Sequence, residues 1–176
     1  WANKVAGPSF TQGVAGNQPR VKTSILGGQP VVRFDGNDWL TGSAVLAAND
    51  DDYTYIVLWR PTANNIIQTP YEQAGPGNGA RASLLAVNAA YGFNGQNNDK
   101  HDLVPFSANV WRLSEMEVNN AAGNNIRLYD NARPYVGATS APGSLAVGTA
   151  GSTIGTKQQA IGSECLNGDA AEVLVY

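Results

Sequence analysis

The run Tyr53–Arg60 constrains the fold more than any other part of the sequence. It reads Tyr-Thr-Tyr-Ile-Val-Leu-Trp-Arg, is rich in aromatic and β-branched residues, and is followed at once by Pro61. In a strand, alternate side chains point to opposite faces. Here one face would carry Tyr53, Tyr55, Val57 and Trp59, and the intervening residues are mostly apolar too. A strand covered on both faces indicates a central position in a β-sandwich.

Turn-forming residues divide the rest of the chain into short apolar runs. The 176 residues include 20 Gly and 9 Pro, and no long stretch has the 3.6-residue period of an amphipathic helix. The pattern predicts about ten short strands. We therefore expect an all-β fold, an antiparallel β-sandwich of the jelly-roll type, with residues 1–176 forming a single domain.

The stretch Pro30–Leu40 combines an apolar run with a strong turn signal. Val31, Val32 and Phe34 precede Asp-Gly-Asn-Asp, a cluster that tolerates left-handed backbone, and Trp39-Leu40 follows. The pattern predicts a hairpin between strands at residues 29–34 and 39–41. Asp35 is expected to form the turn and Trp39 to anchor the core.

The charge of the chain argues against several classes of partner. Only 14% of residues are charged, the net charge is −3, and the 11 Lys and Arg are scattered, so we expect no nucleic-acid binding. No run of apolar residues is long enough to insert in a membrane. Cys165 is the only cysteine, which rules out an internal disulfide, and we expect it to be a small, semi-buried residue.

Five short motifs follow one another along the chain: Arg33-Phe34-Asp35-Gly36 with Trp39-Leu40, Trp111 at the start of a strand, Leu128-Tyr129-Asp130-Asn131, Ile154-Gly155, and Gly168-Asp169 through Tyr176. Their order resembles that of the concanavalin A-like lectin/glucanase superfamily, and in particular of its laminin-G-like jelly-roll domains. Together they span almost the whole chain. The resemblance implies a concanavalin A-like jelly roll, but it does not indicate one function, because such domains bind sugars or proteins, hydrolyse glycans or decorate surfaces.

The resemblance also suggests that the chain is a segment of a longer protein. Such domains usually have a strand before the position of Trp1 and often a short segment after Tyr176. Without them a sheet edge would be open unless another chain covered it. Together with the amide-rich, charge-poor composition, this leads us to expect an extracellular, cell-surface or virion location.

Tyrosines beside amide-rich loops are the candidate ligand-binding residues. A tyrosine ring can stack on a sugar while amides pair with its hydroxyl groups, although the same residues also suit a protein interface. The candidates are Tyr71, Asn78, Tyr91, Asn94, Asn97 and Asn98. Six other aromatic residues are expected in the core, namely Phe34, Trp39, Tyr53, Tyr55, Trp59 and Trp111.

The loop Asn97–Asp102 is the candidate metal site. It holds carboxylates, amides and the only histidine, His101, and oxygen ligands of this kind suit Ca²⁺. Asp99 and Asp102 are the expected ligands. Lys100 lies between them and the spacing matches no established ligand pattern, so no cofactor is required by the sequence.

Glu115 and Glu117 are the closest match to a catalytic acid pattern. Glucanases of the superfamily place three acids on one strand as Glu-x-Asp-x-x-Glu, and here asparagine stands at the end of the pattern (Asn119, Asn120). Two glutamates on the solvated face of an antiparallel strand explain the spacing without catalysis.

The sequence therefore favours a non-catalytic recognition or adhesion module that binds glycans at a surface. Two alternatives remain open. One is a structural decoration, fibre or matrix subunit that assembles with copies of itself or with other subunits through its sheet edges. The other is a glycoside hydrolase or lyase.

Overall fold

The structure is a computed structural model that describes residues 9–47, 52–74, 81–95, 100–119, 125–140, 147–158 and 161–176. These residues form thirteen strands and a short 3-10 helix, η1 (Ala15–Asn17). In chain order the strands are β1 (Arg20–Leu26), β2 (Gln29–Asp35), β3 (Leu40–Gly42), β4 (Asp52–Pro61), β5 (Gln68–Ala74), β6 (Arg81–Val87), β7 (Ala90–Asn94), β8 (Lys100–Pro105), β9 (Arg112–Asn119), β10 (Asn125–Asp130), β11 (Arg133–Ser140), β12 (Gly151–Ile154) and β13 (Asn167–Val175).

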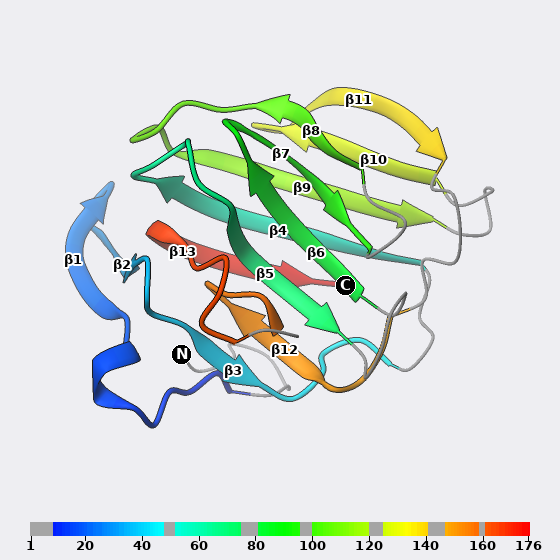
Figure 1. The fold of residues 1–176 in the computed structure, drawn as a ribbon. Helices are drawn as coiled ribbons and strands as arrows, with labels where there is room; N and C mark the ends of the chain where they lie inside the picture. The colour runs from blue at the N-terminus through cyan, green and yellow to red at the C-terminus, as the bar shows by residue number, and fades with distance from the viewer. Residues whose placement is uncertain are drawn as a thin grey trace.

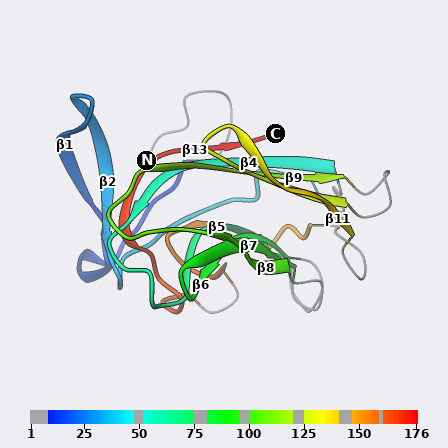
Figure 2. The ribbon, with the colours of Figure 1, turned by 90° about the horizontal axis from the view of Figure 1, so that it is seen from above.

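The strands build two antiparallel sheets that pack face to face (Figures 1 and 2). A seven-stranded sheet has the order β1-β2-β13-β4-β9-β10-β11, and a six-stranded sheet has the order β3-β12-β5-β6-β7-β8. The expected all-β jelly-roll sandwich is confirmed. In the described part of the chain, no helix has the length and apolar character needed to cross a membrane.

The core lies between the sheets and is rich in aromatic side chains. Tyr55 on β4 meets Tyr71 on β5 edge to face, with ring centroids 4.8 Å apart, and Trp59 packs against Tyr91 and Phe106. The Trp59 indole N–H donates a hydrogen bond of 2.8 Å to Ser114 Oγ, which satisfies its polar atom inside the core. The predicted central strand is therefore confirmed as β4.

Two of the six aromatic residues expected in the core lie elsewhere. Trp39 and Trp111 are only partly buried, whereas Phe34, Tyr53, Tyr55 and Trp59 are buried. Trp111 precedes β9 and lies under the Arg60 guanidinium, 5.2 Å from ring centroid to Cζ, outside the sandwich. The expectation that Trp39 anchors the core was wrong, because the chain leaves the sheet at the turn before it. Cys165 is buried.

The turn after β2 connects the two sheets instead of closing a hairpin. β2 pairs with β1 and β13 on its two edges, so neither edge remains for β3, which pairs with β12 in the other sheet. Asp35 does form the turn: its Oδ1 accepts a bond of 3.2 Å from the Asn37 amide. Asp38 Oδ2 accepts the Asp35 amide, and burial, together with the Asp35 charge, raises the pKa of Asp38.

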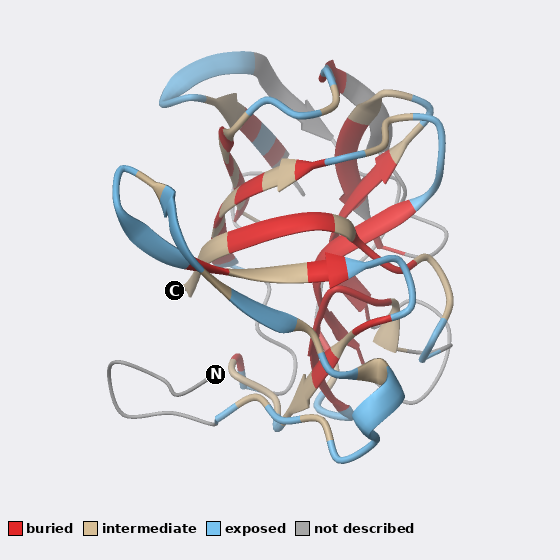
Figure 3. Cartoon of the chain, turned by 90° about the vertical axis from the view of Figure 1, so that its left-hand side faces the viewer, coloured by how far each residue is buried: buried red, intermediate tan, exposed pale blue. Residues whose placement is uncertain are grey.

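The hairpin that the sequence placed after β2 lies before it. β1 and β2 are joined through Gly27 and Gly28, which have φ angles of +54° and +84°, the left-handed conformation that a tight two-residue turn requires. The sequence predicts no strand before residue 29, whereas β1 spans Arg20–Leu26. The burial pattern explains the error, because β1 is largely exposed and has no buried apolar face (Figure 3).

The first and last sequence motifs meet in the middle of the seven-stranded sheet. β13 lies between β2 and β4, with Asp169 opposite both Arg33 and Arg60. The strands approach so closely that a Cβ built on Gly168 would lie 2.4 Å from the Arg60 carbonyl oxygen. A glycine at this position is therefore required by packing.

Gly155, in the Ile154-Gly155 motif, has a similar role against the core. Its φ is +84°, and an added Cβ would lie 2.5 Å from two ring carbons of Phe34. We expect Gly155→Ala to lower the free energy of unfolding by about 2 kcal/mol through overpacking and backbone strain. Urea denaturation measures the change. The control is Gly16→Ala, where nothing lies within 4 Å of the added carbon; equal stability of the two variants would contradict this account.

Candidate functional site on the six-stranded sheet

Three polar side chains gather on the outer face of the six-stranded sheet. Glu72 on β5 is directly opposite Ser83 on β6 and Thr153 on β12. Residues paired across antiparallel strands point to the same face. Tyr71, the neighbour of Glu72, points into the core, so this polar row points away from it.

The carboxylate of Glu72 is held by contacts from three directions. Its Oε1 accepts a hydrogen bond of 3.1 Å from the Gln158 amide, and Ser83 donates a side-chain hydrogen bond to it. Arg81 Nε lies 3.9 Å from Glu72 Oε2. Lys157, next to Gln158, binds Glu164 at 2.9 Å. The chain after β12 thus folds against this face and supplies both a donor and a charge.

Burial raises the pKa of Glu72 to about 7, because the carboxylate is almost fully shielded from water. Arg81, the Gln158 amide, Ser83 and Lys157 all act in the opposite direction and do not cancel the effect. Glu72 therefore changes charge near neutral pH. A buried carboxylate with a perturbed pKa and a specific cationic partner, placed outside the core, is the kind of group that marks a functional site.

The two tyrosines expected to bind a sugar lie in the core. Tyr71 and Tyr91 are fully buried, and their hydroxyl groups donate to Ser152 Oγ at 3.2 Å and to the Tyr129 carbonyl at 3.1 Å. Neither ring has a face open to a ligand, so the expectation that they stack on a sugar is corrected. The physical reason is that β5 and β7 alternate, which turns these two residues inward.

Of the other expected site residues, the structure places only Asn94 and Asp102, both on the six-stranded sheet. Asn78, Asn97, Asn98 and Asp99 lie outside the described residues. The backbones of Asn94 and Asp102 lie in β7 and β8, and Asn94 is opposite Ser83. In the sequence, all of the expected ligand-binding and metal-binding residues lie between Tyr71 and Asp102, the part of the chain that contains strands β5 to β8.

The calcium site at Asp99 and Asp102 stays a prediction. Among the residues that the structure describes, no three histidine, cysteine, aspartate or glutamate side chains come together to hold a metal ion. Asp99 is outside those residues.

Glu115 and Glu117 lie on the outer face of the other sheet. They alternate with buried Ser114 and Met116, which confirms that the two acids share a partly exposed face. Glu117 faces Arg127 at 3.4 Å and accepts a hydrogen bond of 3.3 Å from the Tyr129 hydroxyl.

Sequence reasoning missed Glu72 and Arg81. Both are single charged residues beside a loop rich in glycine, and no motif surrounds them. The available signal was weak: Glu72 is the only charged residue in the run Gln68–Ala74, which is buried along its whole length.

Comparisons with known proteins give a likeness in structure. The sequence matches no protein-family model and no curated protein. Domain 4 of AbnA, an extracellular arabinanase from Geobacillus stearothermophilus solved with arabinotriose, has a TM-score of 0.71 at 13% identity, covering 96% of this chain and 81% of that one.

Two further solved structures are carbohydrate-binding modules. The CBM40 module of the Ruminococcus gnavus IT-sialidase, solved with α2,3-sialyllactose, has a TM-score of 0.58 at 17% identity, covering 74% of this chain and 76% of that one. The CBM66 module from Bacillus subtilis has a TM-score of 0.51 at 14% identity, covering 98% and 96%. The chain is a concanavalin A-like jelly-roll β-sandwich, similar in fold to CBM40 and other carbohydrate-binding modules.

Proposed function

We propose that the protein is a non-catalytic glycan-binding module and that it binds through the outer face of the six-stranded sheet. The observation that carries the proposal is the convergence of Glu72, Arg81, Ser83 and Thr153 on that face. The structural neighbours support it, because one is solved with sialyllactose and another with arabinotriose.

The chemistry of these groups suits sugar hydroxyls. A carboxylate accepts hydrogen bonds from two neighbouring hydroxyl groups, while a guanidinium donates to sugar oxygens in a fixed, planar arrangement. The hydroxyls of Ser83 and Thr153 can donate or accept. Binding requires the carboxylate and the guanidinium to exchange some of their present contacts for contacts with the sugar.

A glycan array with matched variants tests the proposal. We expect the wild type to bind a set of oligosaccharides, and Glu72→Gln and Arg81→Gln each to weaken the binding at least about tenfold, the loss expected for one hydrogen bond to a charged group. Glu115→Gln, the same chemical change on the opposite sheet, is the control and should bind like the wild type. Circular dichroism checks that each variant is folded. An array without hits, or hits that both variants retain, would contradict the proposal.

An extracellular location follows from the same proposal. The neighbour from Geobacillus stearothermophilus is a domain of an extracellular enzyme, and a module of this kind would direct a larger protein to its glycan. Adhesion at a cell or virion surface and assembly through sheet edges stay predictions. Light scattering of the purified chain tests assembly.

A further inference from the structure

A row of charged side chains crosses the outer face of the other, seven-stranded sheet. Arg20 on β1 is opposite Arg33 on β2, and Asp169 on β13 is opposite both Arg33 and Arg60 on β4. Trp111 follows beside Arg60. With strands about 4.8 Å apart, the row from β1 to β9 is about 19 Å long.

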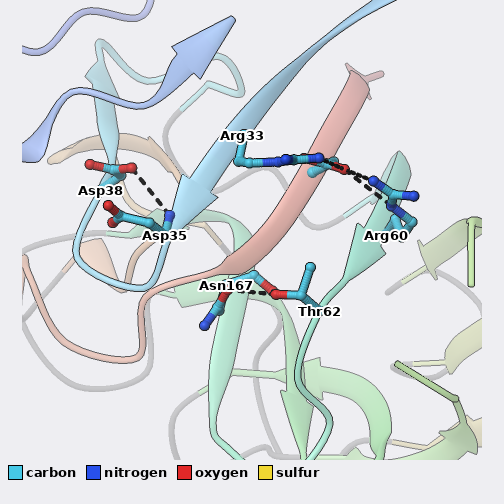
Figure 4. Close-up of polar contacts among 7 residues, drawn as sticks. Arg33, Asp35, Asp38, Arg60, Thr62 and Asn167 are labelled. Carbon is cyan, nitrogen blue, oxygen red and sulfur yellow. Dashed lines mark hydrogen bonds and ion pairs between the residues drawn. The ribbon is translucent and has the colours of Figure 1, made fainter. Parts of the chain in front are cut away.

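Asp169 holds the two inner arginines in place. Its side chain is fully buried and accepts Arg33 Nε at 2.6 Å and Arg33 Nη2 at 3.0 Å. Arg60 donates to the same carboxylate through Nε, at 3.1 Å, and through Nη2. Figure 4 shows Arg33 and Arg60 approaching β13 from opposite sides. Burial alone would raise the pKa of Asp169, but the hydrogen bonds and charges of the two arginines lower it overall.

The arginines retain donors and charge after these contacts. A guanidinium has five N–H donors, and in the hydrogen bonds recorded for the described residues Arg33 and Arg60 each use only Nε and Nη2. Their side chains are 37% and 24% exposed, and Arg20 is exposed. Three arginines and one aspartate give the row a net charge of +2. Trp111 restricts the orientation of Arg60 by stacking.

We propose that this row is a second binding site, for the oxyanion groups of an acidic polysaccharide. A sulfate ester or a carboxylate pairs with a guanidinium through two parallel hydrogen bonds, and a polymer repeats such groups along its length. Cationic groups set along one line fit a repeated anion better than a single small ion. By register, Glu115, Glu117 and Glu172 share this face but lie beside the row, not in it, and Glu117 forms an ion pair with Arg127.

The experiment compares dextran sulfate with uncharged dextran by calorimetry at low ionic strength. The wild type should bind dextran sulfate and not dextran, and added salt should weaken the binding because it screens exposed charges. Arg20→Gln, Arg33→Gln and Arg60→Gln should each lower the affinity roughly tenfold, the loss expected for a charge-assisted hydrogen bond. Arg20→Gln affects an exposed residue, so its result does not depend on the stability of the Asp169 cluster.

Arg127→Gln is the control. Arg127 lies on the same face, is more exposed than Arg33 and Arg60, and pairs with Glu117. It should bind dextran sulfate like the wild type. A parallel titration with polygalacturonate distinguishes the two sources of the oxyanion. If polygalacturonate binds and the three arginine variants lose affinity for it, the site also accepts carboxylates. If polygalacturonate does not bind, the site is specific for sulfate esters. Glu72→Gln should leave the binding of dextran sulfate unchanged. The result therefore tests this site separately from the one proposed on the six-stranded sheet.

Three results would overturn the proposal: no binding of dextran sulfate, equal binding of dextran, or wild-type affinity in all three arginine variants. A DNA duplex that bound as tightly, with the same losses in the variants, would overturn the assignment to a polysaccharide.

Discussion

Asp169→Ala is expected to lower the free energy of unfolding by about 3 kcal/mol, which is typical of removing one partner from a buried ion pair. The carboxylate is fully buried between Arg33 and Arg60 and receives hydrogen bonds from both. Without it, two positive charges would lie on either side of β13 with no anion between them. The cluster also ties β2, β13 and β4 together, so its loss affects the middle of the seven-stranded sheet.

Urea denaturation of Asp169→Ala and Glu117→Ala measures the effect against a matched control. Glu117 forms an ion pair with Arg127 on the same face, but Arg127 is exposed and Glu117 is partly exposed, so its removal should change stability by less than about 1 kcal/mol. Because the pKa of Asp169 is lowered in the folded state, its contribution is complete above the unfolded-state pKa and is lost as the pH falls through the native pKa. The difference in the free energy of unfolding between Asp169→Ala and the wild type should therefore become smaller below about pH 4. An equal loss of stability in Asp169→Ala and Glu117→Ala would contradict the account.

Glu72→Gln should have the opposite effect on stability, and the effect should depend on pH. The pKa of Glu72 is about 7 in the folded state and its ordinary value is 4.5. Between these values the folded chain binds more protons than the unfolded chain, so wild-type stability falls as the pH rises from 4.5 to 7. The fall amounts to about 3 kcal/mol, since each pKa unit corresponds to about 1.4 kcal/mol. Glutamine removes this titration while preserving an acceptor for the Gln158 amide.

Urea denaturation of wild type and Glu72→Gln across this pH range measures the prediction. The variant should gain stability relative to wild type as the pH rises, with the gain levelling off above pH 7. Glu115→Gln, on the partly exposed face of β9, controls for the loss of one carboxylate. Parallel profiles for wild type and Glu72→Gln would show that the carboxylate is not buried as described.

The fold could be predicted from the sequence because its main determinants are local. The alternation in Tyr53–Arg60 gave β4, and the turn residues separated the short strands. The pairing of β2 was not predictable in the same way. The residues 29–41 indicate two strands and a turn, but whether those strands pair depends on β1 and β13, and β13 lies more than a hundred residues away.

The site was harder to predict, because it depends on which face each residue occupies. Tyr71 and Glu72 are adjacent, and the strand places one in the core and the other outside. The sequence pointed to the aromatic member of the pair, since tyrosine is common at sugar sites. The remaining expected residues, including Asn78, Asn97, Asn98 and Asp99, stay predictions, because these four lie outside the described residues. Glu72 is recognisable as a site residue only in the folded structure, where Ser83, Thr153 and Gln158 from other parts of the chain lie next to it.

The most direct test of glycan binding through the six-stranded sheet is an NMR titration of the ¹⁵N-labelled protein with an oligosaccharide identified on the array. We predict that the largest shifts occur at the amides of Glu72, Ser83, Thr153 and Gln158, which surround the carboxylate. Amides on the outer face of the seven-stranded sheet, such as those of Glu115 and Arg127, should not move. Saturable shifts confined to the seven-stranded sheet, with no change around Glu72, would contradict the account.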